Sequence, residues 1–150
     1  MRRLVSIFTE QLEEALKIGP KANLSPFSNS IENVVITGLG GSGIGGEIAT
    51  QLVANQLKVP VVINNDYSLP EFVSSKTLVI VSSFSGNTEE TLAALKIAQD
   101  KKAEIACITS GGKLADIAKE NNYKLLVLPL AFSPRAMLTY SVVQQFFLLA

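Results

Sequence analysis

One stretch of this sequence combines hydroxyl side chains and a glycine in a pattern that could bind an anion. Ser83, Ser85 and Thr88 surround Gly86, between an apolar run and the start of a helical pattern. Helix N-termini offer unpaired N–H groups and the positive end of the helix dipole, and phosphate groups bind there. Gly86 would let a ligand approach the backbone. The stretch favours a phosphate site, although Ser, Asn and Thr are also ordinary helix caps and could serve that purpose without a ligand.

A second stretch, residues 38–46 (GLGGSGIGG), is rich in glycine and also joins an apolar run to a helical pattern. It contains a G-x-G-x-x-G match, and Asp66 lies at the end of the next apolar run, so a dinucleotide site has to be considered. The glycines also fit a tight turn with close helix packing. A third possibility is a small sugar phosphate that contacts both stretches. We favour the sugar phosphate, because a dinucleotide site would not need the hydroxyls of residues 83–88.

Two further segments carry polar residues after predicted strands. Residues 109–114 (TSGGKL) fit ligand contact and a simple Ser110 helix cap equally well. Ser133 and Pro134 fit the N-cap and first position of a helix, and Arg135 then places a cation in the first turn. The helix dipole disfavours a cation there by roughly 0.3–1 kcal/mol. A bound anion could offset that cost, and solvent or a nearby carboxylate such as Glu89 could do the same.

The elements that must position these residues follow an alternating pattern. An N-terminal helix over residues 8–18 precedes strands that we predict at 33–37, 59–63, 78–81, 104–108 and 125–128. Helices follow the strands, one of them over residues 47–56 and the last from Ser133. Such alternation predicts a three-layer αβα sandwich with a five-stranded parallel sheet. The flavodoxin-like order 2-1-3-4-5 would place the loops after strands 1 and 3 side by side at the point where the strand order reverses, which is where ligands bind.

Composition narrows the possible functions. The 150 residues are 47% hydrophobic and 17% charged with zero formal net charge, which predicts a folded domain and gives no reason to expect nucleic acid as a partner. Cys107 is the only cysteine and lies in an apolar run, so we expect a buried, inert thiol. There is no histidine, and we expect no metal site. No apolar run is long enough to span a membrane and no signal peptide is evident, so a cytoplasmic protein is expected.

The sequence resembles the sugar isomerase (SIS) domain family, whose S-x-S-G-x-T loop is matched by residues 83–88. The segments GLGGSGIGG, NDYSLP, SSFSGNTEET, TSGGKL and SPRAM, in this order, are similar to the N-terminal half of the bifunctional phosphoglucose/phosphomannose isomerases of archaea and some bacteria. The resemblance implies reversible aldose–ketose isomerisation of glucose 6-phosphate or mannose 6-phosphate and fructose 6-phosphate. It also implies a cis-enediolate intermediate and no cofactor.

The resemblance also assigns roles to individual residues. The residues that would hold the substrate phosphate are Gly41, through backbone N–H groups near it, and the side chains of Ser42, Ser83, Ser85 and Thr88. Arg135 would be catalytic, stabilising the negative charge that develops on the enediolate oxygens. That role would explain why a cation, Arg135, stands in the first turn of the last helix, where the helix dipole disfavours it.

The resemblance implies a larger protein than this chain. Family members carry two SIS domains, with the base glutamate and the ring-opening histidine in the second. We therefore expect residues 1–30 to form an N-terminal helix and turn-rich segment, residues 31–150 to form the first SIS domain, and the chain to be a fragment truncated at residue 150. A homodimer is expected for the full-length protein. The alternative is a non-catalytic module that senses a phosphosugar, which the missing histidine favours and Arg135 disfavours.

Overall fold

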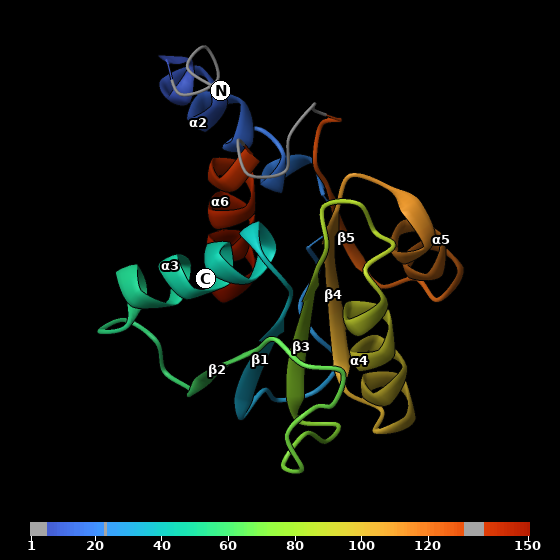
Figure 1. The fold of residues 1–150 in the computed structure, drawn as a ribbon. Coiled ribbons are helices and arrows are strands. Elements are labelled where there is room, and N and C mark those ends of the chain that lie inside the picture. Colours follow the sequence, from blue (N-terminus) through green and yellow to red (C-terminus); the bar gives the residue numbers. More distant parts are fainter. Residues whose placement is uncertain (1–5, 23, 131–136) are drawn as a thin grey trace.

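Five parallel strands form one sheet in the order β2-β1-β3-β4-β5 (Figure 1). The structure is a computed structural model that describes residues 6–22, 24–130 and 137–150. The strands are β1 (Asn33–Thr37), β2 (Val61–Asn64), β3 (Thr77–Ser82), β4 (Glu104–Thr109) and β5 (Lys124–Val127). The predicted strand order and parallel arrangement are thus confirmed, and the order reverses between β1 and β3.

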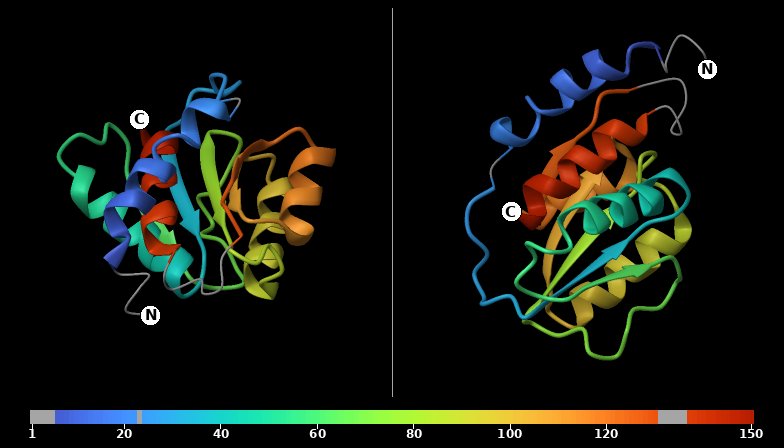
Figure 2. Two further views of the ribbon diagram at one scale, coloured as in Figure 1. Left: turned by 90° about the horizontal axis from the view of Figure 1, so that it is seen from above. Right: turned by 90° about the vertical axis from the view of Figure 1, so that its left-hand side faces the viewer.

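Helices cover both faces of the sheet. They are α2 (Phe8–Ala15), α3 (Gly41–Val53), α4 (Glu89–Asp100), α5 (Gly112–Glu120) and α6 (Leu138–Leu149), and a short 3₁₀ helix spans Gly19–Lys21. Figures 1 and 2 show α3 and α6 on one face, α4 and α5 on the other, and α2 lying outside α6. This is the predicted three-layer αβα sandwich.

The core forms two layers because successive side chains of a strand point to opposite faces. On one face, Ile36 and Ile80 belong to a buried cluster that includes Tyr140 of α6. On the other, Val79 and Cys107 belong to a second buried cluster that includes residues of α4 and α5. All residues of β3 are buried, as expected for the central strand of a sheet covered on both sides. The polar loops at the carboxyl ends of β1 and β3 are thereby held on a rigid base.

Cys107 lies fully inside the second cluster. Desolvation by burial raises the pKa of its thiol to about 12. The prediction that Cys107 is buried is confirmed. A thiol that stays protonated is a poor nucleophile, and that this thiol is inert stays a prediction.

One helix boundary differs from its prediction in a way that matters for the site. Helix α3 begins at Gly41 rather than at residue 47, so most of the glycine-rich stretch is helix and not loop. The glycines serve close packing: a Cβ atom at Gly46 would lie 2.7 Å from Ile36 Cγ2, and one at Gly45 would lie 2.4 Å from Ser141 Oγ. The predicted start of the last helix at Ser133 lies outside the described residues, and α6 itself begins at Leu138.

None of the helices within residues 6–22, 24–130 and 137–150 has the length and apolar character needed to cross a membrane.

Candidate functional site

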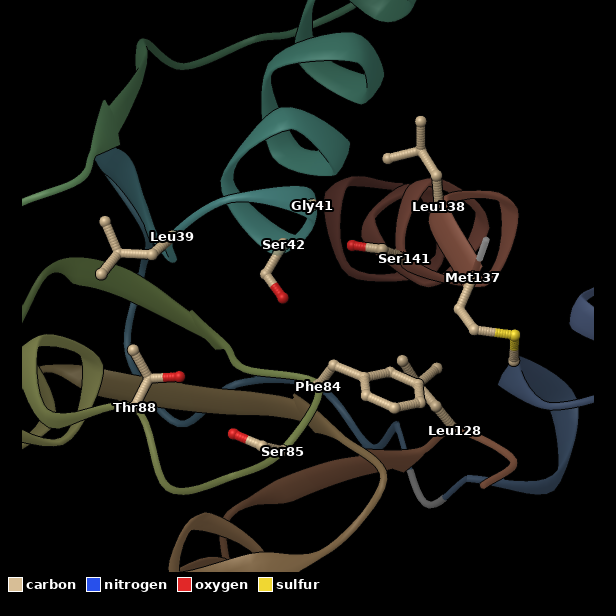
Figure 3. Close-up of a pocket in the computed structure, with 10 residues that line it drawn as sticks. All are labelled: Leu39, Gly41, Ser42, Phe84, Ser85, Thr88, Leu128, Met137, Leu138 and Ser141. Carbon is tan, nitrogen blue, oxygen red and sulfur yellow. The ribbon is translucent and has the colours of Figure 1, made fainter. Parts of the chain in front are cut away.

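A pocket of about 130 Å³ opens where the loops after β1 and β3 meet the start of α6 (Figure 3). Gly41 and Ser42 contribute from the first turn of α3, and Ser85 and Thr88 contribute from the loop between β3 and α4. The remaining lining residues are Leu39, Phe84, Leu128, Met137, Leu138 and Ser141. All the phosphate-binding residues predicted from the sequence, except Ser83, therefore lie around one pocket at the point where the strand order reverses.

Ser83 has a supporting position instead. It is only 3% exposed and is not among the residues that line the pocket. A hydrogen bond of 2.8 Å joins its Oγ to Thr88 Oγ1, and the Gly86 N–H donates to the same Ser83 Oγ over 3.1 Å. In this geometry Ser83 fixes the turn and orients the Thr88 hydroxyl.

The N-terminus of α4 is not closed by a side-chain cap. Thr88 occupies the N-cap position, yet neither it nor any other described side chain makes a capping hydrogen bond there. The neighbouring polar groups are used within the loop: the Asn87 N–H donates to Ser85 Oγ over 3.2 Å, and Asn87 Nδ2 donates to the Ser85 carbonyl over 3.2 Å. Capping therefore does not explain these hydroxyls. The first-turn N–H groups of α4 are placed to receive an anion.

The N-terminus of α3 shows the same property on the opposite side of the pocket. Its N-cap position is Gly40, and no side chain in the described part of the chain caps it. Two helix N-termini, α3 and α4, thus contribute residues to one small pocket. Their dipoles favour a negative charge between them.

The loop over residues 109–114 supports the site from outside. The Ser110 hydroxyl donates to the Phe84 carbonyl over 2.6 Å, and the Ser110 N–H donates to the same carbonyl over 3.0 Å. The N–H of Leu114, in the first turn of α5, donates to the Gly86 carbonyl over 2.9 Å. Ser110 is therefore neither a helix cap nor a lining residue. The loop holds the β3–α4 loop in place.

Gly86 makes the contact between these two loops possible. Its φ is +68°, in the left-handed region, and a Cβ atom there would lie 1.8 Å from the Gly111 carbonyl oxygen. The expectation that Gly86 lets a ligand approach the backbone is wrong, because the space beside its Cα is filled by Gly111. The glycine is needed for packing between loops.

No charged side chain lines the pocket among the described residues. The two carboxylates of the first α4 turn interact with Tyr67 of the β2–β3 segment instead. Desolvation, followed by the negative charges of Glu89 and Glu90, raises the pKa of the Tyr67 hydroxyl. Hydroxyls and helix N-termini would therefore do most of the anion binding in this part of the molecule.

The geometry does not favour the dinucleotide alternative. Asp66, the candidate ribose ligand, is exposed, and its Oδ1 accepts a hydrogen bond from the Tyr67 N–H over 2.6 Å. It does not line the pocket that contains Ser42, Ser85 and Thr88. Within the described ranges, no group of three or more His, Cys, Asp or Glu residues could hold a metal ion.

Arg135, the predicted catalytic residue, lies outside the described residues. Sequence reasoning missed the wall of the pocket formed by Leu128, Met137, Leu138 and Ser141. Phe84 is the second residue of the S-x-S-G-x-T match, but its apolar side chain gave no reason to predict contact with a phosphate. Ser141 lies in an apolar helix where periodicity indicates a buried face and not a pocket wall.

The fold is an αβα sandwich with a pocket at the reversal of the strand order, the place where open parallel sheets bind their ligands. A model of the SIS domain family matches residues 29–150. The chain therefore belongs to the SIS domain family.

Two relatives with named activities and one solved structure are similar to this chain. The chain is 47% identical over 134 residues to the bifunctional phosphoglucose/phosphomannose isomerase of Caldicellulosiruptor bescii, covering 89% of this chain and 40% of the relative. It is 43% identical over 116 residues to the D-glucosamine-6-phosphate 4-epimerase of Sulfolobus acidocaldarius, covering 77% of this chain and 36% of that one. Among solved structures, the Vibrio vulnificus NanR protein complexed with ManNAc-6P superposes with a TM-score of 0.70 at 16% identity, covering 97% of this chain and 60% of that chain, which shows a shared fold.

The chain spans about 40% of the length of the isomerase relative and about 36% of the epimerase.

Proposed function

We propose that this chain is the phosphate-binding half of an aldose–ketose isomerase that interconverts glucose 6-phosphate or mannose 6-phosphate and fructose 6-phosphate. The observation that carries the proposal is the convergence of Ser42, Ser85 and Thr88 with the uncapped N-termini of α3 and α4 in one pocket. A phosphate placed there accepts hydrogen bonds from three hydroxyls and from first-turn N–H groups.

The names of the relatives support a hexose phosphate as the ligand more firmly than they support isomerisation as the reaction. The isomerase and the epimerase carry out different named reactions, yet both names denote a hexose phosphate. This chain matches a part of each protein, about 40% of the isomerase and 36% of the epimerase. We therefore assign phosphate anchoring to this part and the choice of reaction to the remainder of the protein.

In the proposed mechanism, the phosphate fixes one end of the open-chain sugar, and a base outside this chain moves a proton between C2 and C1. Negative charge then develops on the oxygens of the cis-enediolate. Arg135 stabilises that charge, an electrostatic contribution of the kind that is worth about 3–4 kcal/mol when a single donor is removed from such a site. Met137 and Leu138, which follow Arg135 closely in the chain, line the pocket and support this assignment.

The wider organisation is part of the same proposal. Residues 1–30 form an N-terminal segment, residues 31–150 form the first of two SIS domains, and the full-length protein is a cytoplasmic homodimer that acts in hexose phosphate metabolism. The competing function is a non-catalytic phosphosugar sensor. The absence of histidine from the 150 residues favours it, because the commonest general acid or base is missing.

Thermal unfolding with and without fructose 6-phosphate tests the site. We expect Ser85→Ala to lose most of the ligand-induced rise in Tm. Ser74→Ala is the matched control, because Ser74 is also exposed and makes the same kind of local hydrogen bond. The Lys76 N–H donates to Ser74 Oγ, just as the Asn87 N–H donates to Ser85 Oγ. Equal ligand protection in wild type and both variants would mean that the Ser85 hydroxyl only shapes its turn.

Turnover separates the isomerase from the sensor. We expect the 150-residue chain alone to bind fructose 6-phosphate weakly and not to isomerise it, whereas the full-length protein does. Appreciable isomerisation by the 150-residue chain would contradict the assignment of the proton chemistry to the remainder of the protein. A full-length protein that binds the ligand without turnover would favour the sensor.

A further inference from the structure

Ser141, on α6, is a buried hydroxyl whose hydrogen-bonding capacity is not used. The residue is 6% exposed, and its Oγ has no hydrogen-bond partner in the described part of the chain. A buried polar group without a partner costs roughly as much as a lost hydrogen bond. Ser141 also lines the pocket that contains Ser42, Ser85 and Thr88. An unused buried hydroxyl in the wall of a ligand pocket needs an explanation.

The position of this hydroxyl differs from that of the phosphate-binding groups. A Cβ atom at Gly45 would lie 2.4 Å from Ser141 Oγ, so the hydroxyl faces the second turn of α3. Figure 3 shows it projecting from α6 toward α3, across the pocket from Ser85 and Thr88. Gly45 follows Gly41 by one helical turn, a rise of about 6 Å along the helix. A phosphate held at the helix N-termini is too compact to reach that far.

We propose that the Ser141 hydroxyl hydrogen-bonds the sugar portion of the bound phosphosugar, and so helps to position the carbon chain rather than the phosphate. This inference rests on the proposed function, because it assumes that the phosphate lies at the N-termini of α3 and α4. Phe84, Met137 and Leu138 provide apolar surface beside the hydroxyl, which suits the carbon backbone of a sugar. Ser141 is thus a candidate for orienting the substrate.

The test compares two ligands and two variants of the same chain. Ser141→Ala is expected to weaken fructose 6-phosphate binding by about 3- to 10-fold, the range for one hydrogen bond, with the affinity for inorganic phosphate unchanged within twofold. Thr50→Val is the matched control, because Thr50 Oγ1 is another buried hydroxyl without a partner but does not line the pocket. We expect Thr50→Val to leave both affinities unchanged. Isothermal titration measures all six affinities.

A second readout separates ligand contact from a structural role. Without ligand, Ser141→Ala should raise Tm by about 2–4 °C, because it removes an unsatisfied buried group. A structural hydroxyl would instead lower Tm when removed. The expected combination is therefore a more stable free protein that binds the sugar phosphate less tightly.

Four results would overturn the inference. Unchanged fructose 6-phosphate affinity in Ser141→Ala would overturn this inference and leave the proposed function standing. An equal loss of affinity for fructose 6-phosphate and inorganic phosphate would do the same. A fall in the Tm of the free variant would assign Ser141 to packing. If wild type binds neither ligand, the proposed function fails and this inference fails with it.

Discussion

Replacing Gly86 with alanine tests how the β3–α4 loop is held. A Cβ atom at this position would lie 1.8 Å from the Gly111 carbonyl oxygen and 2.8 Å from Thr109 Oγ1, so the two loops cannot keep their present separation. The φ of +68° adds a backbone cost of about 1–3 kcal/mol for a residue with a side chain.

Separating the loops also disrupts the hydrogen bonds between them. The N–H of Leu114 donates to the Gly86 carbonyl over 2.9 Å, and the N–H of Lys113 donates to Asn87 Oδ1 over 3.1 Å. Each such bond contributes about 0.5–1.5 kcal/mol net. Adding both to the backbone cost, we expect Gly86→Ala to lower the free energy of unfolding by about 2–6 kcal/mol.

Gly40→Ala is the control for the backbone term. Gly40 also has a positive φ, +54°, but no atom lies within 4 Å of a Cβ built there. We expect this variant to lose only about 1–3 kcal/mol. Urea denaturation measures both values. If Gly86→Ala were no more destabilising than Gly40→Ala, the contact between the two loops would not stabilise the site.

Three other perturbations have defined outcomes. Gly45→Ala should cost about 1–3 kcal/mol in urea denaturation, because its Cβ would lie 2.4 Å from Ser141 Oγ and force α3 and α6 apart; wild-type stability would contradict that packing. The Cys107 thiol should not react with a disulfide reagent at pH 8 until the protein unfolds, and rapid labelling of the native protein would refute this. Burial raises the pKa of this thiol to about 12, so the free energy of unfolding should fall as the pH rises from about 9 toward 12. The fall should be smaller in Cys107→Ala. Tyr140→Phe should lose about 0.5–1.5 kcal/mol in urea denaturation, because it removes the hydrogen bond that the Tyr140 hydroxyl donates to Glu14 and so loosens α2 from α6; no change would show that the bond contributes nothing.

The sheet could be predicted because its signal is simple. Apolar runs alternate with helical patterns, and only a few topologies satisfy that alternation, so the strand order and the meeting of the β1 and β3 loops followed directly. The start of α3 could not be predicted in the same way. Glycines usually weaken helices, yet here Gly45 and Gly46 permit close contact with α6 and β1, and tertiary packing overrides local preference.

Within the site, residue types were easier to predict than their roles. Ser83 and Ser85 are alike in sequence, but one is buried beneath the loop and the other is exposed and lines the pocket. Only the path of the backbone separates them. Ser141 could not be found from sequence, because helical periodicity shows which face is buried and not whether a pocket touches it.

Backbone amide chemical shifts, measured while the chain is titrated with fructose 6-phosphate and then with inorganic phosphate, test the phosphate site most directly. The proposal predicts that both ligands cause their largest shifts in the first turns of α3 and α4, at Gly41, Ser42 and the residues that follow Thr88. Shifts concentrated elsewhere, or no shifts at millimolar ligand, would contradict the assignment of this pocket to the phosphate.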